Sequence, residues 1–314
     1  MKILVTGGCG YKGSVLVPAL LDKGHDVTVV DVMWFGNYLP KHPRLTVEQK
    51  SVLRAREIDF SGIDAVIHLS SVANDPCGDL NPKLTWETSA LATMEVADFA
   101  AKAGVKQFIY ASSGSVYGVC EDERVIETSA LNPISEYNKT KMVGERVLLS
   151  YGNDMIVQIV RPATVCGLSP RMRLDVSVNM LTMQALKNKE ITVFGGNQTR
   201  PNIHIDDIAS VYLFLLENPT VTGIYNAGFE NLSIMEIAEM VCAKVDAKIT
   251  VTASNDPRSY RVCSDKLLDA GFKPKKSVQI AIDEIVAAYH DGTLTDEKRH
   301  YNLQWMQSEV RIDD

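Results

Sequence analysis

Short runs of apolar residues alternate with longer segments of mixed polarity from the first residues of the chain onward. The runs include "KILVTG", "HDVTVVD", "IDAVIHLSS" and "VKQFIYASS", and the first mixed segment is "SVLVPALLDKG". Continuous apolar runs are typical of strands buried on both faces, and the longer segments between them are typical of covering helices. The pattern therefore predicts repeated strand–helix–strand units, and hence an α/β fold with a doubly wound parallel sheet.

Two predicted helices, at 84–104 and 135–152, carry more apolar residues than one buried stripe needs. Each ends at a glycine, which suits the left-handed position that follows a helix. A homodimer interface through the helices near 81–103 and 135–151 would bury this surplus, and ordinary core packing would bury it equally well. Both interpretations stay open. The surplus residues are Trp86, Leu91, Met94 and Phe99 in the first helix and Met142, Val147 and Leu148 in the second.

The regular alternation of strands and helices ends near residue 165. There the loop "CGLSPRMR" is followed by shorter strands and helices. We therefore expect a nucleotide-binding domain at 1–165 and a smaller C-terminal α/β substrate-binding lobe at 166–314. Strands near 155–160, 203–205 and 223–226 are candidates to return to the main sheet, so the boundary is soft.

Composition and charge narrow the class of protein. The 314 residues have a formal net charge of −7, and no apolar run is long enough to span a bilayer. An acidic chain lacks the dominant basic surface that nucleic acid requires. We therefore predict no nucleic-acid or membrane partner, and a cytoplasmic location because the sequence begins directly with a strand-like segment. The six cysteines are scattered without metal-ligand spacing, which favours reduced thiols and no metal site.

A glycine-rich turn follows the first predicted strand. In "VTGGCGYKGS", Gly7, Gly10 and Gly13 are three residues apart and open a predicted helix, whose free N–H groups favour a pyrophosphate. Asp31 ends the next predicted strand, where a carboxylate accepts hydrogen bonds from a ribose 2′-hydroxyl and repels a 2′-phosphate. This arrangement predicts NAD rather than NADP, although Asp31 could instead cap the following loop. Lys12 is unusual, because an apolar residue normally packs at its position.

A Ser, a Tyr and a Lys form the candidate reaction centre. Tyr137 and Lys141 are four residues apart, so both side chains project from one face of a helix. Tyrosine is a poor base at neutral pH, and a neighbouring ammonium together with the positive ring of an oxidised nicotinamide would lower its pKa. Ser113 ends a predicted strand, where open parallel sheets bind their ligands. A Tyr and Lys pair alone is usually a solvated helix pair, but the glycine turn and Ser113 favour catalysis.

With these motifs the chain resembles an extended short-chain dehydrogenase/reductase of the NAD-dependent nucleotide-sugar epimerase/dehydratase family, which has a Rossmann-type fold. The similarity runs through "TGGCGYKGS", "DAVIHLSS", "SSGSVYG", "YNKTK", "RPATVCGLSPRMR", "VFGG" and "RPNIHIDDIA". It implies NAD as cofactor, a nucleotide-activated sugar as substrate, and Ser113, Tyr137 and Lys141 as catalytic residues. The cofactor-binding residues that it implies are Gly7, Gly10, Tyr11, Lys12, Gly13, Asp31, Leu69, Ser70, Ser71, Tyr137 and Lys141.

The two positions after Ser113 distinguish reactions within this family. Dehydratases carry an Asp and a Glu there, and 3,5-epimerases carry a Cys at the second position, whereas this chain has Gly114 and Ser115. A hydroxyl is a poor replacement for a thiol as a base, because its pKa is far higher. The expected reaction is therefore hydride transfer at a sugar carbinol, most simply C4, by a 4-epimerase or a 4-dehydrogenase.

Two alternatives are kept beside this hypothesis. An NAD(P)H-dependent nucleotide keto-sugar reductase would use the same residues in the reverse direction, although Asp31 disfavours NADPH. A non-catalytic NAD-binding sensor or scaffold would have no use for a phenolate, which Tyr137 and Lys141 argue against. Thr164 stands where hexose 4-epimerases carry an Asn, and "SPRMRLD" resembles enzymes of surface-polysaccharide pathways, so the sugar is left open.

A nucleotide sugar carries a diphosphate, for which arginine offers planar, bidentate donors. His204 beside Asp206 and His68 after a buried run are both expected to be structural hydrogen-bonding residues. The resemblance places the substrate-binding residues at Ser113, Ser115, Thr164, Asn179, Thr192, Phe194, Arg200, Asp256 and Arg258.

Overall fold

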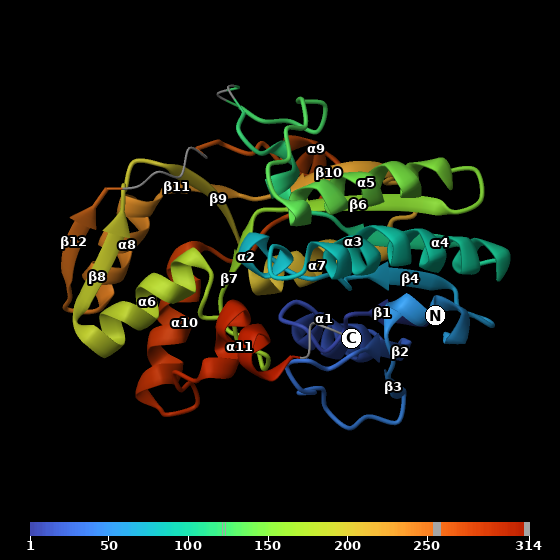
Figure 1. Ribbon diagram of the computed structural model, residues 1–314, viewed down its shortest axis with the longest axis horizontal. Coiled ribbons are helices and arrows are strands. Elements are labelled where there is room, and N and C mark those ends of the chain that lie inside the picture. The colour runs from blue at the N-terminus through green and yellow to red at the C-terminus, as the bar shows by residue number, and fades with distance from the viewer. Residues whose placement is uncertain (121, 123, 254–258, 311–314) are drawn as a thin grey trace.

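A seven-stranded parallel sheet forms the centre of the protein (Figure 1). The computed structural model describes residues 1–120, 122, 124–253 and 259–310 of the chain. Strand order reverses between β1 and β4, which is the mark of a doubly wound sheet and confirms the predicted fold class. From one edge to the other the sheet runs through β10 (Gly223–Ala227), β6 (Ile156–Pro162), β5 (Gln107–Ala111), β4 (Ala65–His68), β1 (Lys2–Thr6), β2 (Asp26–Asp31) and β3 (Leu45–Gln49).

Helices cover both faces of this sheet and explain why its strands are apolar throughout. On β1, Ile3 and Val5 pack into one core cluster, while Leu4 between them packs into the other. The first cluster includes apolar residues of α1 (Gly13–Asp22) and α7 (Ile205–Glu217). The second includes residues of the helices that follow β4 and β5. Successive side chains of a strand point to opposite faces, so each face needs its own apolar residues.

The two helices predicted from surplus apolar residues lie side by side on one face of the sheet (Figure 1). The first is continuous but irregular: α3 (Pro82–Trp86) leads into a π-helical segment, η2 (Glu87–Leu91), and then α4 (Ala92–Lys102). The second is α5 (Glu136–Ser150). Gly104, which follows α4, has a φ of 80°, as expected for a glycine after a helix end.

The smaller lobe is built around two short sheets. Of the three candidate strands for the main sheet, those near 155–160 and 223–226 join it as β6 and β10, but the strand near 203–205 does not. It forms part of β9 (Thr199–His204), because β10 already occupies the free edge of β6. The sheets consist of β11 (Glu230–Ser233), β9 and β7 (Thr164–Cys166) in one, and β12 (Lys248–Thr252) with β8 (Glu190–Phe194) in the other.

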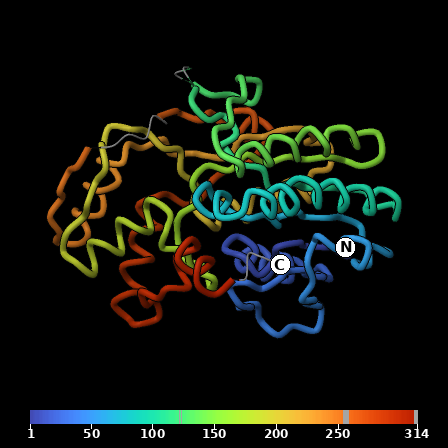
Figure 2. The backbone as a smooth tube through the Cα atoms, viewed as in Figure 1, coloured from blue at the N-terminus to red at the C-terminus, as the bar shows by residue number. Residues whose placement is uncertain are grey.

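Helices of the lobe pack against these sheets, and the C-terminal segment returns to the first half of the chain. Figure 2 shows the chain ending in α11 (Asn302–Glu309), which contacts the short helix that follows β4. Within the described ranges, none of the helices is long and apolar enough to cross a membrane. The remaining elements are α2 (Asp75–Gly78), α6 (Ser177–Asn188), α8 (Ile234–Lys244), α9 (Asp265–Asp269), α10 (Val278–His290), η1 (Val52–Glu57), η3 (Gly114–Tyr117) and η4 (Lys298–His300).

Candidate active site

A cavity of about 680 Å³ lies at the carboxyl ends of the parallel strands, where open α/β sheets bind their ligands. The loops after β1, β2, β4, β5 and β6 form one wall, and the smaller lobe forms the other. The predicted site residues that line it are Gly7, Gly10, Tyr11, Lys12, Gly13, Asp31, Leu69, Ser70, Ser71, Ser113, Ser115, Tyr137, Lys141, Thr164 and Arg200.

The turn between β1 and α1 requires its glycines. Gly7 has a φ of 72°, and a Cβ atom there would lie 2.7 Å from the backbone nitrogen of Ser70. A Cβ atom on Gly13 would lie 2.6 Å from the Cα atom of Gly8. Among the described residues, the backbone N–H groups of Tyr11 and Lys12 have no acceptor, and both stand at the N-terminus of α1. This cradle fits a pyrophosphate, whose charge the helix dipole stabilises.

Asp31 lines the cavity and also caps the glycine turn. Its Oδ2 accepts a hydrogen bond of 2.9 Å from the Cys9 nitrogen, and its Oδ1 accepts one of 2.7 Å from the Met33 nitrogen. Burial raises the pKa of this carboxyl, although the two backbone hydrogen bonds oppose the rise. The capping role that the sequence left open is therefore present. Each carboxylate oxygen has a second lone pair, so a ribose hydroxyl can still bind.

Tyr137 and Ser113 both line the cavity, and the Ser113 hydroxyl lies near enough to lower the pKa of the Tyr137 phenol. Ser113 Oγ lies 2.6 Å from Ser115 Oγ, which in turn donates a hydrogen bond of 2.5 Å to Asn138 Oδ1. Burial raises the pKa of Tyr137, and the neighbouring Ser113 hydroxyl only partly offsets this rise. The polypeptide alone thus does not supply the lowered pKa expected from Lys141, and the positive ring of an oxidised cofactor has to contribute.

Lys141 is buried beneath Tyr137. Its ammonium donates a hydrogen bond of 2.8 Å to the Ala111 carbonyl and lies 5.9 Å from the centre of the Tyr137 ring. Burial holds the pKa of this ammonium well below its usual range, and the neighbouring Lys12 adds to the effect. Gly144 explains how α5 comes so close to the sheet, because a Cβ atom there would collide with the Tyr110 ring.

A buried ion pair, which the sequence analysis did not predict, joins the strand β6 to the helix that carries Tyr137 and Lys141. Arg161 on β6 donates hydrogen bonds of 2.8 and 2.6 Å to the two carboxylate oxygens of Glu145 on α5. Ser112, next to Ser113, donates a hydrogen bond of 2.5 Å to the same carboxylate. The signal in the sequence was an arginine inside the apolar run "IVQIVRP". Such a charge is buried only when it is paired.

The structure does not bring every predicted substrate-binding residue to the cavity. Asn179 is fully buried in α6, and its amide bonds the Gly167 backbone and the Tyr11 hydroxyl. Its side chain therefore joins the lobe to the glycine turn instead of facing a ligand. Thr192 and Phe194 lie on β8, which pairs only with β12 among the described strands. Asp256 and Arg258 lie outside the described residues.

The loop before α6 contributes charges to the cavity that the sequence analysis did not assign. Arg171 and Arg173 both line it, together with Asp175. Arg173 Nε donates a hydrogen bond of 2.9 Å to Asp175 Oδ1. Arg171 lies flat against the Phe35 ring, 3.8 Å from its centre, and donates a hydrogen bond of 2.6 Å to Asn302 Oδ1. The motif "SPRMRLD" indicated this loop, but only its folding over α1 shows where the arginines lie.

The histidines outside the cavity have structural partners, as the sequence predicted. His68 is buried between Thr6, at 2.7 Å from Nδ1, and Thr93, at 3.0 Å from Nε2. His204 Nδ1 accepts a hydrogen bond of 3.1 Å from the Asp206 nitrogen and caps α7.

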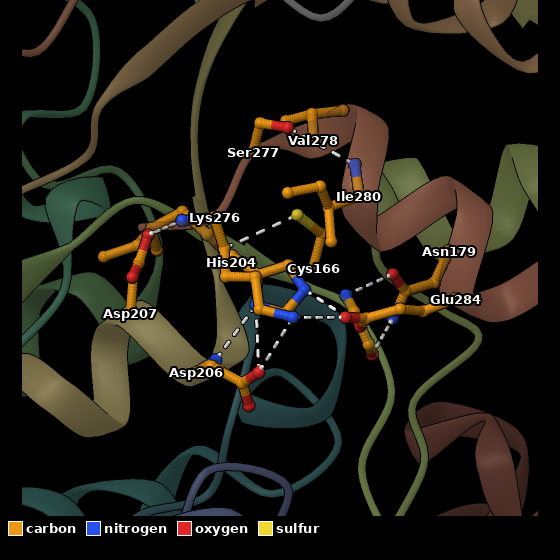
Figure 3. A network of polar contacts seen from close by, with 12 residues as sticks. Cys166, Asn179, His204, Asp206, Asp207, Lys276, Ser277, Val278, Ile280 and Glu284 are labelled. Carbon is orange, nitrogen blue, oxygen red and sulfur yellow. Dashed lines mark hydrogen bonds and ion pairs between the residues drawn. The ribbon is translucent and has the colours of Figure 1, made fainter. Parts of the chain in front are cut away.

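Figure 3 shows that His204 belongs to a network of polar contacts that links the start of α7 to α10. Its Nε2 atom lies 3.0 Å from Glu284 Oε2. Lys276 binds the same Glu284 at 2.7 Å and lies 3.6 Å from Asp206. His204, Asp206 and Glu284 have the donor types of a metal site, but the ammonium of Lys276 already lies against both carboxylates.

Comparisons with known proteins agree with this architecture. A Bacillus subtilis protein named as an uncharacterized UDP-glucose epimerase is 30% identical, over 77% of this chain and 81% of its own length. The Thermotoga maritima UDP-glucose 4-epimerase, solved with UDP-glucose, has a TM-score of 0.83 at 23% identity, over 94% of this chain and 100% of that one. The Thermus thermophilus enzyme of the same name, solved with NAD, has a TM-score of 0.81 at 23% identity, over 92% of this chain and 100% of that one. The profile of the NAD dependent epimerase/dehydratase family matches residues 3–228, so the chain belongs to that family, as the motifs predicted.

Proposed function

We propose that this protein is an NAD-dependent enzyme that acts on a nucleotide-activated sugar by hydride transfer at a carbinol carbon, most simply C4, as a 4-epimerase or a 4-dehydrogenase. The observation that carries the proposal is one cavity that combines the glycine cradle with Ser113, Tyr137 and Lys141. The family match and the relatives named as UDP-glucose epimerases support it.

The reaction needs a proton acceptor beside the sugar hydroxyl. Tyr137 would accept that proton while Ser113 holds the same oxygen by a hydrogen bond. NAD, when bound, supplies the acceptor for the hydride that leaves the carbinol carbon. Lys141 favours the phenolate of Tyr137 once a second positive charge is present. In a 4-epimerase, the keto sugar would rotate in the site and take the hydride back on its other face. Tyr137 would then return the proton to the sugar oxygen.

The surroundings of Ser113 argue for hydride transfer without a second acid–base pair. Gly114 has no side chain, and the Ser115 hydroxyl is occupied by Ser113 and Asn138. Neither carboxylate nor thiol follows Ser113 where a dehydratase or a 3,5-epimerase would need one. The keto-sugar reductase remains the reverse of the same chemistry, and Asp31 in the cavity favours NAD over NADPH for it.

Substrate binding in this proposal uses the wall formed by the smaller lobe. Arg200 and Thr164 line the cavity from β9 and β7, which pair side by side. An arginine there suits the diphosphate of a nucleotide sugar. Asp256 and Arg258, which the resemblance also implies, stay sequence-based proposals.

The test is incubation of the purified protein with UDP-, GDP-, CDP- and dTDP-sugars, followed by chromatography and mass spectrometry of the products. Conversion to the 4-epimer without added cofactor supports a 4-epimerase, and stoichiometric NADH formation supports a 4-dehydrogenase. Reduction of a keto sugar to the alcohol, with oxidation of NADH to NAD and no detectable forward reaction, supports the reductase. Failure to convert or oxidise any sugar, with NAD bound, would instead favour a non-catalytic NAD-binding protein.

Assembly and cellular context belong to the same proposal. A homodimer through 81–103 and 135–151 is supported by exposed apolar side chains on these helices: Leu91 is 53% exposed, Met94 43% and Leu149 39%. Trp86 and Leu148 instead contribute to packing within the chain. Sedimentation velocity should show a dimer that Leu91→Glu dissociates.

We also propose that the protein is a cytoplasmic enzyme of polysaccharide biosynthesis. Fusion to a fluorescent protein would test the location, and deletion of the gene would test whether polysaccharide is lost.

A further inference from the structure

Lys12 belongs to the glycine turn, and the proposed function does not use its side chain. It stands at the N-cap of α1, lines the cavity and is half-buried. Its ammonium donates no hydrogen bond and forms no ion pair with any residue in the described part of the chain. A partly buried cation without a protein partner is costly, which indicates that it faces an electron-rich ligand.

The fold places this ammonium among other cations. Tyr11 donates a hydrogen bond of 2.7 Å to the Gly167 carbonyl, and Ser14 Oγ lies 2.7 Å from Ser169 Oγ, so the loop before α6 is fixed over the glycine turn. This connection brings Arg173 beside Lys12, and Lys141 is the other cationic neighbour. Burial and Arg173 lower the pKa of Lys12 to about 8, which still leaves it mainly charged at neutral pH.

The neighbours of Lys12 show which part of the dinucleotide it faces. Arg173 acts electrostatically on both Lys12 and Tyr137, and Lys141 lies under the Tyr137 ring. In the proposed function the sugar would lose its proton at Tyr137, so the nicotinamide would lie near that residue. Asp31 would hold the adenosine ribose at the end of β2.

We propose that Lys12 sets the relative affinity of the protein for the two redox states of the cofactor. Its ammonium lies at the nicotinamide end and makes the protein bind reduced NADH more tightly than oxidised NAD. This inference rests on the proposed function for the position of the nicotinamide. Hydride acceptance removes the positive charge of the ring, so two nearby ammonium groups repel the oxidised form and not the reduced one. In an epimerase this difference favours the intermediate in which the sugar is oxidised and the cofactor is reduced.

The experiment compares the dissociation constants of NADH and NAD for the purified protein, by fluorescence titration and calorimetry, without any sugar. Lys12→Met should lower the preference for NADH by roughly tenfold or more, the effect of removing a charge several ångströms away at an effective dielectric constant near 20. Lys12→Arg keeps the charge and should keep most of the preference. Lys50→Met is the matched control, because Lys50 also lines the cavity but is paired with Glu48 at 2.8 Å.

Two results would overturn the proposal. If Lys12→Met weakens NAD and NADH by the same factor, Lys12 binds the pyrophosphate and does not discriminate between redox states. If neither affinity changes, the ammonium faces something other than the cofactor. Thermal melting of each variant verifies that it is folded. Because no sugar is present, a failure here is distinct from a failure of the proposed reaction, which the sugar panel tests separately.

Discussion

Arg161 and Glu145 join the strand before the lobe to the helix of the catalytic pair through two hydrogen bonds, both in the protein interior. Glu145 is one turn beyond Lys141 on α5, and it also holds Ser112, the neighbour of Ser113. The ion pair therefore fixes the strand end that carries Ser113 relative to the helix that carries Tyr137. Loss of this ion pair should therefore change both the stability of the fold and the relative position of Ser113 and Tyr137.

Removing one partner of this pair should be strongly destabilising. Glu145→Gln leaves the buried guanidinium of Arg161 without its counter-ion, and we expect the free energy of unfolding to fall by about 3–5 kcal/mol. Urea denaturation measures this loss. Asp98→Asn is the control, because water screens the exposed Lys102–Asp98 pair, which should therefore contribute little to stability. A loss no larger than that of the control would show that Arg161 finds another partner.

Tyr137→Phe should remove activity but not cofactor binding. The phenol is the acid–base group in the proposed reaction, and such groups contribute roughly 10²–10⁴-fold in rate. We expect kcat on the converted sugar to fall by about that factor, while the dissociation constant of NAD changes by less than about threefold. Tyr151→Phe, at the far end of α5 and outside the cavity lining, is the matched control. Near-normal turnover in Tyr137→Phe would remove the residue from the mechanism.

Cofactor choice should depend on Asp31. Its buried carboxylate lies where a 2′-phosphate would bind, and repulsion predicts that NAD binds at least about tenfold more tightly than NADP. Asp31→Asn should reduce this ratio, mainly by weakening NAD, because the side chain still accepts one backbone hydrogen bond. Competition titrations with both dinucleotides give the ratio. Asp26→Asn, exposed at the start of the same strand, should leave it unchanged, and a wild-type preference for NADP would contradict the prediction.

The fold could be predicted because its signal is local. Ile3, Leu4 and Val5 are all apolar since a central parallel strand is buried on both faces, and that run is visible in the sequence. The strand near 203–205 was the difficult case, because its apolar pattern does not say which partner it pairs with. Pairing of β9 with β7 and β11 is decided by tertiary contacts, and no single-sequence pattern encodes those.

The candidate site likewise contains residues that local sequence patterns predict and residues that only long-range contacts place. The glycine turn, Ser113, Tyr137 and Lys141 reach one cavity because the ends of parallel strands and the helix after them share one edge of the sheet. Asn179 could not be placed from sequence, since its role is a long-range bond to Tyr11. The Arg161–Glu145 pair was overlooked for a similar reason: each residue alone looks like an ordinary charge in a strand or a helix.

Stability should fall in acid through His68. Burial and the nearby Lys141 lower the pKa of His68 to about 3, whereas an unfolded histidine titrates near about 6.5. Between these values the unfolded chain binds a proton that the folded protein does not, so stability is lost as the pH falls, at up to about 1.4 kcal/mol per unit. Urea denaturation at several pH values should show a shallower acid slope for His68→Gln than for the wild type. His290→Gln, exposed on α10, should keep the wild-type slope; equal slopes for all three would exclude His68 as the cause.

The C-terminal helix should slow cofactor release. Residues Tyr301–Gln304 line the cavity, and Trp305 donates a hydrogen bond of 2.7 Å from Nε1 to the carbonyl of Trp34, in the loop after β2. Trp305→Ala removes that bond and the ring that packs α11 onto this loop, so the dissociation rate of NADH should rise by roughly tenfold, equivalent to about 1.4 kcal/mol of lost contact. Stopped-flow displacement with excess NAD measures the rate. Gln307→Ala, exposed on the same helix, should release NADH at the wild-type rate, and equal rates in Trp305→Ala would mean that α11 does not hold the cofactor in place.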